Sequence, residues 1–300
     1  MNEPSKSSVS RLNVERDAPP HKSSDYLPEK PVVVIEPRSD SLAVTLRDLW
    51  QYRDLFYILT LRDIKVRYKQ TVLGVLWVVI QPLFMMVVFT FFFGRLAAIP
   101  SDGIPYPIFF YTGLLPWIFF SNSLNNSGNS LIGNSSLITK VYFPRMIIPM
   151  AAVGSGLMDF AVAFGMLFVL MIYYQVGFSI NLLMLPVLTF LTALLATGAG
   201  LLMSALNVKY RDIRNALPFL IQLWMFATPI IYPSSLIPDK LRWLSWINPL
   251  SALIEGYRSA IFGRPFDLKG IAISIFIIFI LLIYSIYAFR QMERRFADII

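Results

Sequence analysis

The chain has 300 residues, of which 56% are hydrophobic and 15% are charged, and it carries a net charge of +8 with no cysteine and one histidine. A soluble domain of this composition would expose too much apolar surface, so the chain is predicted to be an all-α polytopic membrane protein. The missing cysteines exclude disulfides and thiolate metal sites, and a lone histidine, His21, excludes a histidine metal cluster. The basic residues lie beside apolar segments, so nucleic-acid binding receives very little weight.

Residues 1–40 contain many Ser, Pro, Lys and Asp residues with little periodicity, which predicts a disordered cytoplasmic tail. The run from Val32 to Ile35 is the segment of this tail best suited to docking. The first long apolar stretch begins near Val72, which is too late and too long for a signal peptide. Targeting is therefore expected to come from the first membrane helix.

Residues 41–70 are predicted to form an amphipathic helix on the membrane surface. Its apolar face is formed by side chains at helical spacing, namely Tyr52, Leu55, Phe56 and Leu59. A basic stripe lies beside that face and contains Arg62, Lys65 and Lys69. A solvated helix of a small soluble subdomain is the alternative. The aromatic residues of this segment favour the headgroup layer: Trp50, Tyr52, Tyr57 and Tyr68.

Six apolar runs are predicted to be membrane spans: about 72–93, 106–127, 146–174, 182–206, 216–232 and 271–289. The basic residues up to Lys69 stay outside the first span, because Arg or Lys at mid-bilayer costs about 2.5–3.5 kcal/mol. The second run continues into the polar stretch 121–127, so either the helix leaves the bilayer early or this face borders protein or water. After the short fifth run, two short re-entrant helices in the outer leaflet are predicted, at Leu241–Trp246 and Leu250–Phe262.

The distribution of basic residues predicts that both termini are cytoplasmic. With six spans, one side of the membrane receives Arg62, Lys65, Arg67, Lys69, Lys140, Arg145, Lys209, Arg211, Arg214, Arg290, Arg294 and Arg295. The other side receives Arg95 and a mixed set in the long third loop: Lys240, Arg242, Arg258, Arg264 and Lys269. The richer side is assigned to the cytoplasm.

The sequence lacks the motifs of nucleotide binding and of hydrolytic chemistry, including G-x-x-x-x-G-K-[ST], G-x-S-x-G and H-E-x-x-H. Asp159 is the one clear acid within the predicted spans. An intramembrane carboxylate is a candidate for a proton relay or for a pore lining. A lone carboxylate without an obvious partner more often serves helix packing or faces a cavity, and Glu255 in the second re-entrant segment is interpreted in the same way.

Aromatic residues make up 15% of the chain, and an interfacial belt is the favoured explanation of them. The alternative is that some of them stack on sugar rings inside a pore. The candidate pore-lining residues are Trp117, Phe119, Phe120, Asn122, Asp159, Trp224 and Tyr232.

Several sequence blocks resemble the ABC-2 type permeases of polysaccharide export, and they follow that family's order from about Ile35 to the C-terminus. The early blocks are Leu61 to Gly74, Gln81-Pro82, Gly113 to Trp117 and Lys140 to Arg145. The later blocks are Asn207 to Asp212, Pro229 to Tyr232 and Asn248-Pro249. Residues 1–30 lie outside the resemblance.

The resemblance implies that residues 71–300 form a six-span transmembrane domain in the bacterial cytoplasmic membrane. This half-transporter would pair with a second copy of itself and export a lipid-linked glycan, such as O-antigen, capsule or teichoic acid. It would be a transport subunit and not an enzyme, with no cofactor of its own. ATP and Mg²⁺ would be bound by a separate ABC-type ATPase subunit.

In that family, the helix before the first span and a short helix between spans two and three receive the movement of the ATPase. Carried over, the coupling residues are Arg62, Asp63, Lys65, Arg67, Lys140, Tyr142, Phe143, Pro144 and Arg145. Tyr142 and Phe143 are suited to an apolar cleft of the partner, with Lys140 and Arg145 pairing with its acids. The alternative is that Lys140 and Arg145 only enforce topology, and the two roles are compatible.

The sequence also allows two other classes of protein. A small-molecule or drug exporter of the same fold would share the coupling blocks and differ in its pore. A membrane-embedded glycan-processing enzyme would need paired acids or a catalytic base, for which Asp159 alone is poor support. The residues do not identify the sugar, its lipid carrier or the type of cell envelope.

Overall fold

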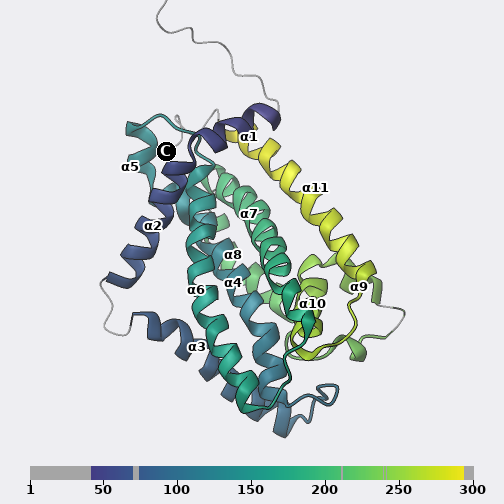
Figure 1. Ribbon diagram of the computed structural model, residues 1–300. Coiled ribbons are helices and arrows are strands. Elements are labelled where there is room, and N and C mark those ends of the chain that lie inside the picture. The colour runs from purple at the N-terminus through teal and green to yellow at the C-terminus, as the bar shows by residue number, and fades with distance from the viewer. Residues whose placement is uncertain (1–41, 70–73, 211, 239, 241, 294–300) are drawn as a thin grey trace, which may run out of the picture. The chain divides into compact units, whose positions relative to one another are not determined.

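The computed structural model describes residues 42–69, 74–210, 212–238, 240 and 242–293 (Figure 1). This part of the chain folds into helices and contains no strand, which confirms the predicted all-α class. The predicted tail over residues 1–40 lies outside the described residues. So do residues 70–73, which separate the predicted surface helix from the first span.

Four helical segments in the described part are long and apolar enough to cross a membrane. The first, Val75–Leu96, consists of α3 (Val75–Phe89) and a π-helical segment, Thr90–Leu96. The others are α6 (Ile147–Tyr173), the segment Ile180–Lys209 that contains α7 (Leu185–Lys209), and α11 (Leu268–Glu293). They coincide with predicted spans one, three, four and six, so the chain is a multi-pass membrane protein.

The second predicted span lies in α4 (Tyr106–Gly133), which also contains the polar stretch 121–127. The helix continues through this stretch without a break. It packs between α6 and α7 and also contacts α3 and α10. Ser123 and Ser127 are fully buried against these neighbours. One face of the polar stretch therefore borders protein, as one of the two alternatives predicted.

The fifth predicted span, 216–232, is helical over only part of its length. Helix α8 (Ile213–Phe226) has 14 residues, which is about 21 Å at 1.5 Å per residue and short of a hydrocarbon core of about 30 Å. The chain then leaves the helix before Pro229, because a proline disfavours helical geometry at the preceding residue. Two short helices follow close to their predicted positions, α9 (Arg242–Ile247) and α10 (Pro249–Phe262).

The ends of several long helices meet in a second buried cluster. This cluster joins residues from α2, the end of α4, the start of α6 and the ends of α7 and α11, namely Leu59, Leu131, Ile147, Val208 and Phe289. We call this the basic end, because it carries Arg62, Lys140, Arg145, Lys209 and Arg290.

The connections after α3, α6, α8 and α10 lie at the opposite end. Asp102 accepts a hydrogen bond from Ser235 at 2.8 Å and forms an ion pair with Arg264 at 3.5 Å. Asn181 donates to the carbonyl of Arg264 at 3.1 Å. Arg264, which was counted among the loop cations, is therefore neutralised by an acid.

The predicted surface helix 41–70 is divided at Tyr52 into α1 (Leu42–Gln51) and α2 (Arg53–Lys69). The predicted apolar face exists: Leu59 is buried, and Tyr52, Leu55 and Phe56 pack against the cluster of the basic end. This face contacts protein, since α2 runs beside α6 (Figure 1). Its placement at the membrane surface stays a prediction.

A buried arginine organises the opposite end of the bundle. Arg258 on α10 is 2% exposed, and its guanidinium donates to the carbonyls of Pro229 at 2.7 Å and Ile230 at 2.9 Å. Glu255 accepts a hydrogen bond from the same group at 3.3 Å, and the ring of Phe109 lies 3.8 Å from it. Glu255 therefore serves helix packing, the interpretation that the sequence favoured, and its partner is Arg258, a cation of the same predicted loop.

We expect Gly113→Ala to destabilise the protein by displacing this arginine. A Cβ atom on Gly113 would lie 2.9 Å from the Nη2 atom of Arg258, and overpacking of this kind costs about 1–3 kcal/mol. Gly165→Ala is the matched control, because its Cβ would meet nothing within 4 Å and alanine is the better helix former. Thermal unfolding in detergent should give a lower Tm for the first variant and an unchanged or higher Tm for the second. Equal Tm values for the two variants would contradict the packing argument.

Candidate functional site

The two predicted coupling segments touch each other at the basic end. The short helix α5 (Ser135–Lys140) follows α4 directly, and Asn134 joins the two helices. The guanidinium of Arg62 on α2 donates to Asp63 at 2.8 Å and to the side-chain oxygen of Asn134 at 2.9 Å. A charge-assisted hydrogen bond therefore joins α2 to the α4–α5 junction.

The predicted docking pair Tyr142 and Phe143 points in two directions. Neighbouring side chains in an extended segment alternate between its two sides, and Val141 has extended backbone geometry. The side chain of Tyr142 is 79% exposed, whereas Phe143 is 5% exposed and packs in the cluster of the basic end. The interpretation of Phe143 as a docking residue is therefore corrected: its ring fills this chain's own core.

The remaining coupling candidates also differ in their surroundings. Lys65 and Lys140 are exposed, and Pro144 is half-buried. Arg145 contacts the end of α11, where its backbone N–H donates to the carboxylate of Glu293 at 3.2 Å and its guanidinium donates to the Glu293 carbonyl at 3.0 Å. Arg145 thus ties the start of α6 to the C-terminal end of α11.

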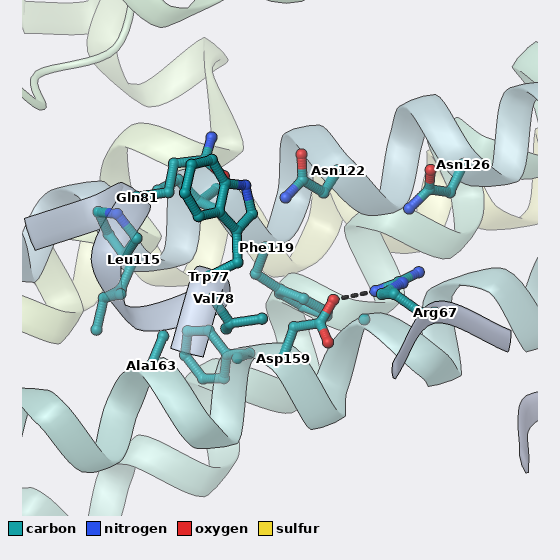
Figure 2. A pocket seen from close by; sticks show the side chains of 14 residues that line it. Arg67, Trp77, Val78, Gln81, Leu115, Phe119, Asn122, Asn126, Asp159 and Ala163 are labelled. Carbon is teal, nitrogen blue, oxygen red and sulfur yellow. Dashed lines mark hydrogen bonds and ion pairs between the residues drawn. The ribbon is translucent and has the colours of Figure 1, made fainter. Parts of the chain in front are cut away.

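Asp159 has partners on α2. Its carboxylate forms an ion pair with Arg67 (Figure 2). It also accepts a hydrogen bond from the hydroxyl of Tyr68. Arg67 also lies 3.4 Å from the hydroxyl of Ser155, one turn before Asp159 on α6. Burial and the hydrogen bond to Asp159 raise the pKa of Tyr68 well above its usual range, so its hydroxyl remains a donor. Asp159 therefore has partners that the sequence pattern did not identify.

Arg67 and Asp159 form part of the wall of a cavity of about 220 Å³ between α2, α3, α4 and α6 (Figure 2). Asp159 lies roughly 18 Å along α6 from Ile147, at 1.5 Å per residue. Three of the predicted pore-lining residues line this cavity, namely Phe119, Asn122 and Asp159. Other lining residues were missed by the sequence analysis, and they include Trp77, Gln81 and Asn126. The spacing of Asn122 and Asn126, one helical turn apart, was the signal that a polar helix face exists there.

The other predicted pore residues lie elsewhere. Trp117 and Phe120 are buried in the core around α4, and the ring of Phe120 meets that of Trp224 edge to face at 5.0 Å. Trp224 and Tyr232 line a second cavity of about 690 Å³ at the opposite end, together with residues of α9. The structure therefore divides the predicted set between two cavities and a packed core.

Asn248 fixes one wall of the second cavity. Its side-chain oxygen accepts hydrogen bonds from the N–H of Leu250, at the start of α10, and from the indole of Trp224 at 3.0 Å. Its amide donates to Thr228 at 2.9 Å. The Asn248-Pro249 block thus begins α10 as an N-cap and holds the end of α8 in place.

Comparison with known proteins identifies the family. The family model described as "ABC-2 type transporter" matches residues 54–262, which include α2 and every later helix up to α10. The chain belongs to the ABC-2 type transporter family. It is therefore a transport subunit, and membership of this family implies partnership with an ABC-type ATPase subunit.

Curated relatives cover most of this permease. It is 32% identical over 248 residues to an "O-antigen export system permease protein RfbA" of Klebsiella pneumoniae, which covers 82% of this chain and 95% of the relative. It is 31% identical to a protein of the same name from Myxococcus xanthus, with 71% and 82% covered. It is 28% identical to "Polysialic acid transport protein KpsM" of Escherichia coli, with 68% and 79% covered.

We expect the Arg67–Asp159 pair to behave as a coupled unit in the stability of this permease. Arg67→Met and Asp159→Leu should each lower the free energy of unfolding by about 1.5–3 kcal/mol, because each leaves a partly buried charge without its partner. The double variant should recover part of this loss, since no unpaired charge remains. The measurement is the Tm of the four proteins of this cycle in detergent.

Lys65→Met serves as the control for this cycle, because Lys65 is exposed on the same helix and does not line the cavity. Its effect should add to that of Asp159→Leu without any interaction term. Strict additivity of Arg67→Met and Asp159→Leu would contradict the pairing.

Proposed function

We propose that this permease exports a lipid-linked polysaccharide across the bacterial cytoplasmic membrane, with energy from a separate ABC-type ATPase that binds ATP and Mg²⁺. The observation that carries the proposal is the similarity over most of the chain to two O-antigen export permeases and to a polysialic acid transport protein. A polar cavity and an aromatic one within an apolar bundle fit a polymer that carries many hydroxyl groups.

The proposed arrangement has six spans, with both termini and the basic end in the cytoplasm. The alternation of helix ends between the basic end and the opposite end supports it, as does the positive-inside bias. In this arrangement α8 crosses part of the bilayer from the cytoplasmic side, and α9 and α10 occupy the outer leaflet beyond it. Residues 1–40 form a cytoplasmic tail, and residues 71–300 form the transmembrane domain.

A second copy of the chain is proposed to complete the transport path. Supporting this, α3 has a mean hydropathy typical of a span and little of it is buried within one chain. Several large side chains of α3 and of the π-helical segment after it remain exposed, including Phe84, Val87, Phe91 and Phe92. In a dimer, the exposed faces of α3 from the two copies would contact each other or lipid. A path for the polymer would lie between the two copies.

ATP-driven closure of the partner subunits is proposed to push α2 and α5 together. The hydrogen bond between Arg62 and Asn134 makes these helices move as one body. The pair of Arg67 and Asp159 links α2 to α6 at the wall of the cavity, so a shift of α2 would change the shape of the cavity. Tyr142 is proposed to dock on the ATPase, with Lys65 and Lys140 meeting its acidic side chains.

Deletion of the gene is expected to remove the surface polysaccharide and to leave lipid-linked polymer accumulating inside the cell. Immunoblotting of surface and intracellular glycan measures both quantities, and a plasmid copy should restore export. A deletion strain that keeps its surface glycan would contradict the proposal and would favour export of a small molecule by the same fold.

Tyr142→Ala is expected to weaken the complex with the ATPase by at least about fivefold, because an exposed aromatic anchor contributes more than 1 kcal/mol to a typical interface. Val141→Ala is the control, since Val141 is an exposed neighbour that offers a smaller side chain. Co-purification in detergent and the ATPase rate of the complex measure the effect. Unchanged assembly and unchanged ATP turnover in Tyr142→Ala would exclude Tyr142 as a docking residue.

A further inference from the structure

We propose that the cavity between α2, α3, α4 and α6 is a subsite that binds one uncharged sugar unit of the exported polymer. This inference rests on the proposed function and specifies where in this chain the polymer is recognised. The groups that carry it are the ring of Trp77, the amides of Asn122 and Asn126, and the paired charges of Arg67 and Asp159.

The two asparagines present polar groups that the protein does not satisfy. Asn122 and Asn126 are both exposed, and among the described residues their side-chain amides make no hydrogen bond. They lie roughly 10–17 Å from the last residue of α4, at 1.5 Å per residue, and line the same cavity as Arg67 and Asp159. Amides without a protein partner at a cavity wall favour water or a polar ligand there.

The chemistry of the lining matches a sugar. Each asparagine amide offers two N–H donors and one carbonyl acceptor, and a sugar hydroxyl both donates and accepts. The side chain of Trp77 is 57% exposed, so its ring is available to the apolar C–H face of a pyranose. Gln81, one turn after Trp77 on α3, adds a third amide to the same wall (Figure 2).

The charge of the cavity favours an uncharged unit over the phosphate of a lipid carrier. Arg67 is the cation of the lining, and it is already neutralised by Asp159. A phosphate group would have to displace that carboxylate and leave it without its partner, which is costly in a low-dielectric site. A neutral sugar requires no such exchange.

The size of the cavity favours a single sugar unit. Its volume of about 220 Å³ lies below the range of about 300–1,000 Å³ that encloses a drug-sized ligand. A small subsite of this kind holds one unit weakly and releases it, as conduction of a polymer demands. The wall that contains Arg67 belongs to α2, so movement of that helix would change the subsite during each cycle.

The test uses the intact complex of permease and ATPase in lipid nanodiscs, with lipid-linked polymer extracted from the deletion strain. We expect the double variant Asn122→Ala/Asn126→Ala to raise the polymer concentration for half-maximal ATPase stimulation at least tenfold. The variant should fold, because alanine favours the helix and no hydrogen bond is lost. Asn125→Ala, on the same helix but outside the cavity lining, should change this concentration less than twofold.

The chain has no cysteine, so a single Asn126→Cys substitution allows a second measurement on the same complex. Polymer freed of its lipid should slow the reaction of this thiol with a water-soluble maleimide, and the lipid carrier freed of sugar should not. Protection by the sugar-free carrier alone would overturn the proposal and assign the cavity to a lipid headgroup.

The outcomes separate the two proposals. A wild-type complex that the polymer does not stimulate would contradict the proposed function. A wild-type complex that is stimulated, together with a double variant of unchanged response, would overturn the sugar subsite and leave the proposed function intact.

Discussion

Every charge inside an apolar helical bundle must find a partner, and this constraint determines how the helices of the permease are fixed to one another. The guanidinium of Arg258 donates hydrogen bonds to two backbone carbonyls and to a carboxylate, and it lies over an aromatic ring. These contacts join α10 to α4 and to the chain after α8. Arg67 forms an ion pair with Asp159, and this pair holds α2 against α6. Without its partner, each buried or partly buried cation would be left with an uncompensated desolvation cost.

Arg258 and Arg67 differ in burial and in the number of their hydrogen-bond acceptors. This difference affects how easily the helices that they join can shift. Arg258 is almost completely buried and uses several acceptors at once, which makes the opposite end rigid. The side chain of Arg67 is 32% exposed and is paired with a single carboxylate, so α2 can shift against α6 at lower cost. This weaker attachment suits the role proposed for α2, which is to receive force from an ATPase.

Hydropathy was sufficient to locate four spans, because a long apolar run has few alternatives to crossing a membrane. Hydropathy could not show which side chains pair with each other, because paired residues can be far apart in the sequence. Arg67 and Asp159 are 92 positions apart, and no local pattern joins them. Phe143 and Tyr142 are neighbours with similar side chains, and only the surrounding helices determine which of them is buried. The end of α8 at Phe226 was missed, because the apolar run continues to residue 232 although the helix does not.

The polar stretch of α4 shows how one run of sequence serves packing and function together. Ser123 and Ser127 face α6 and α7, where they are small enough to let Gly156 and Gly200 approach: a Cβ on Gly156 would lie 2.7 Å from the Ser123 hydroxyl. Asn122 and Asn126 precede these serines by one residue each, so they project from another face of the helix and reach the cavity. A more apolar sequence would be a better lipid-facing span, but it would lose both the close helix packing and the polar wall.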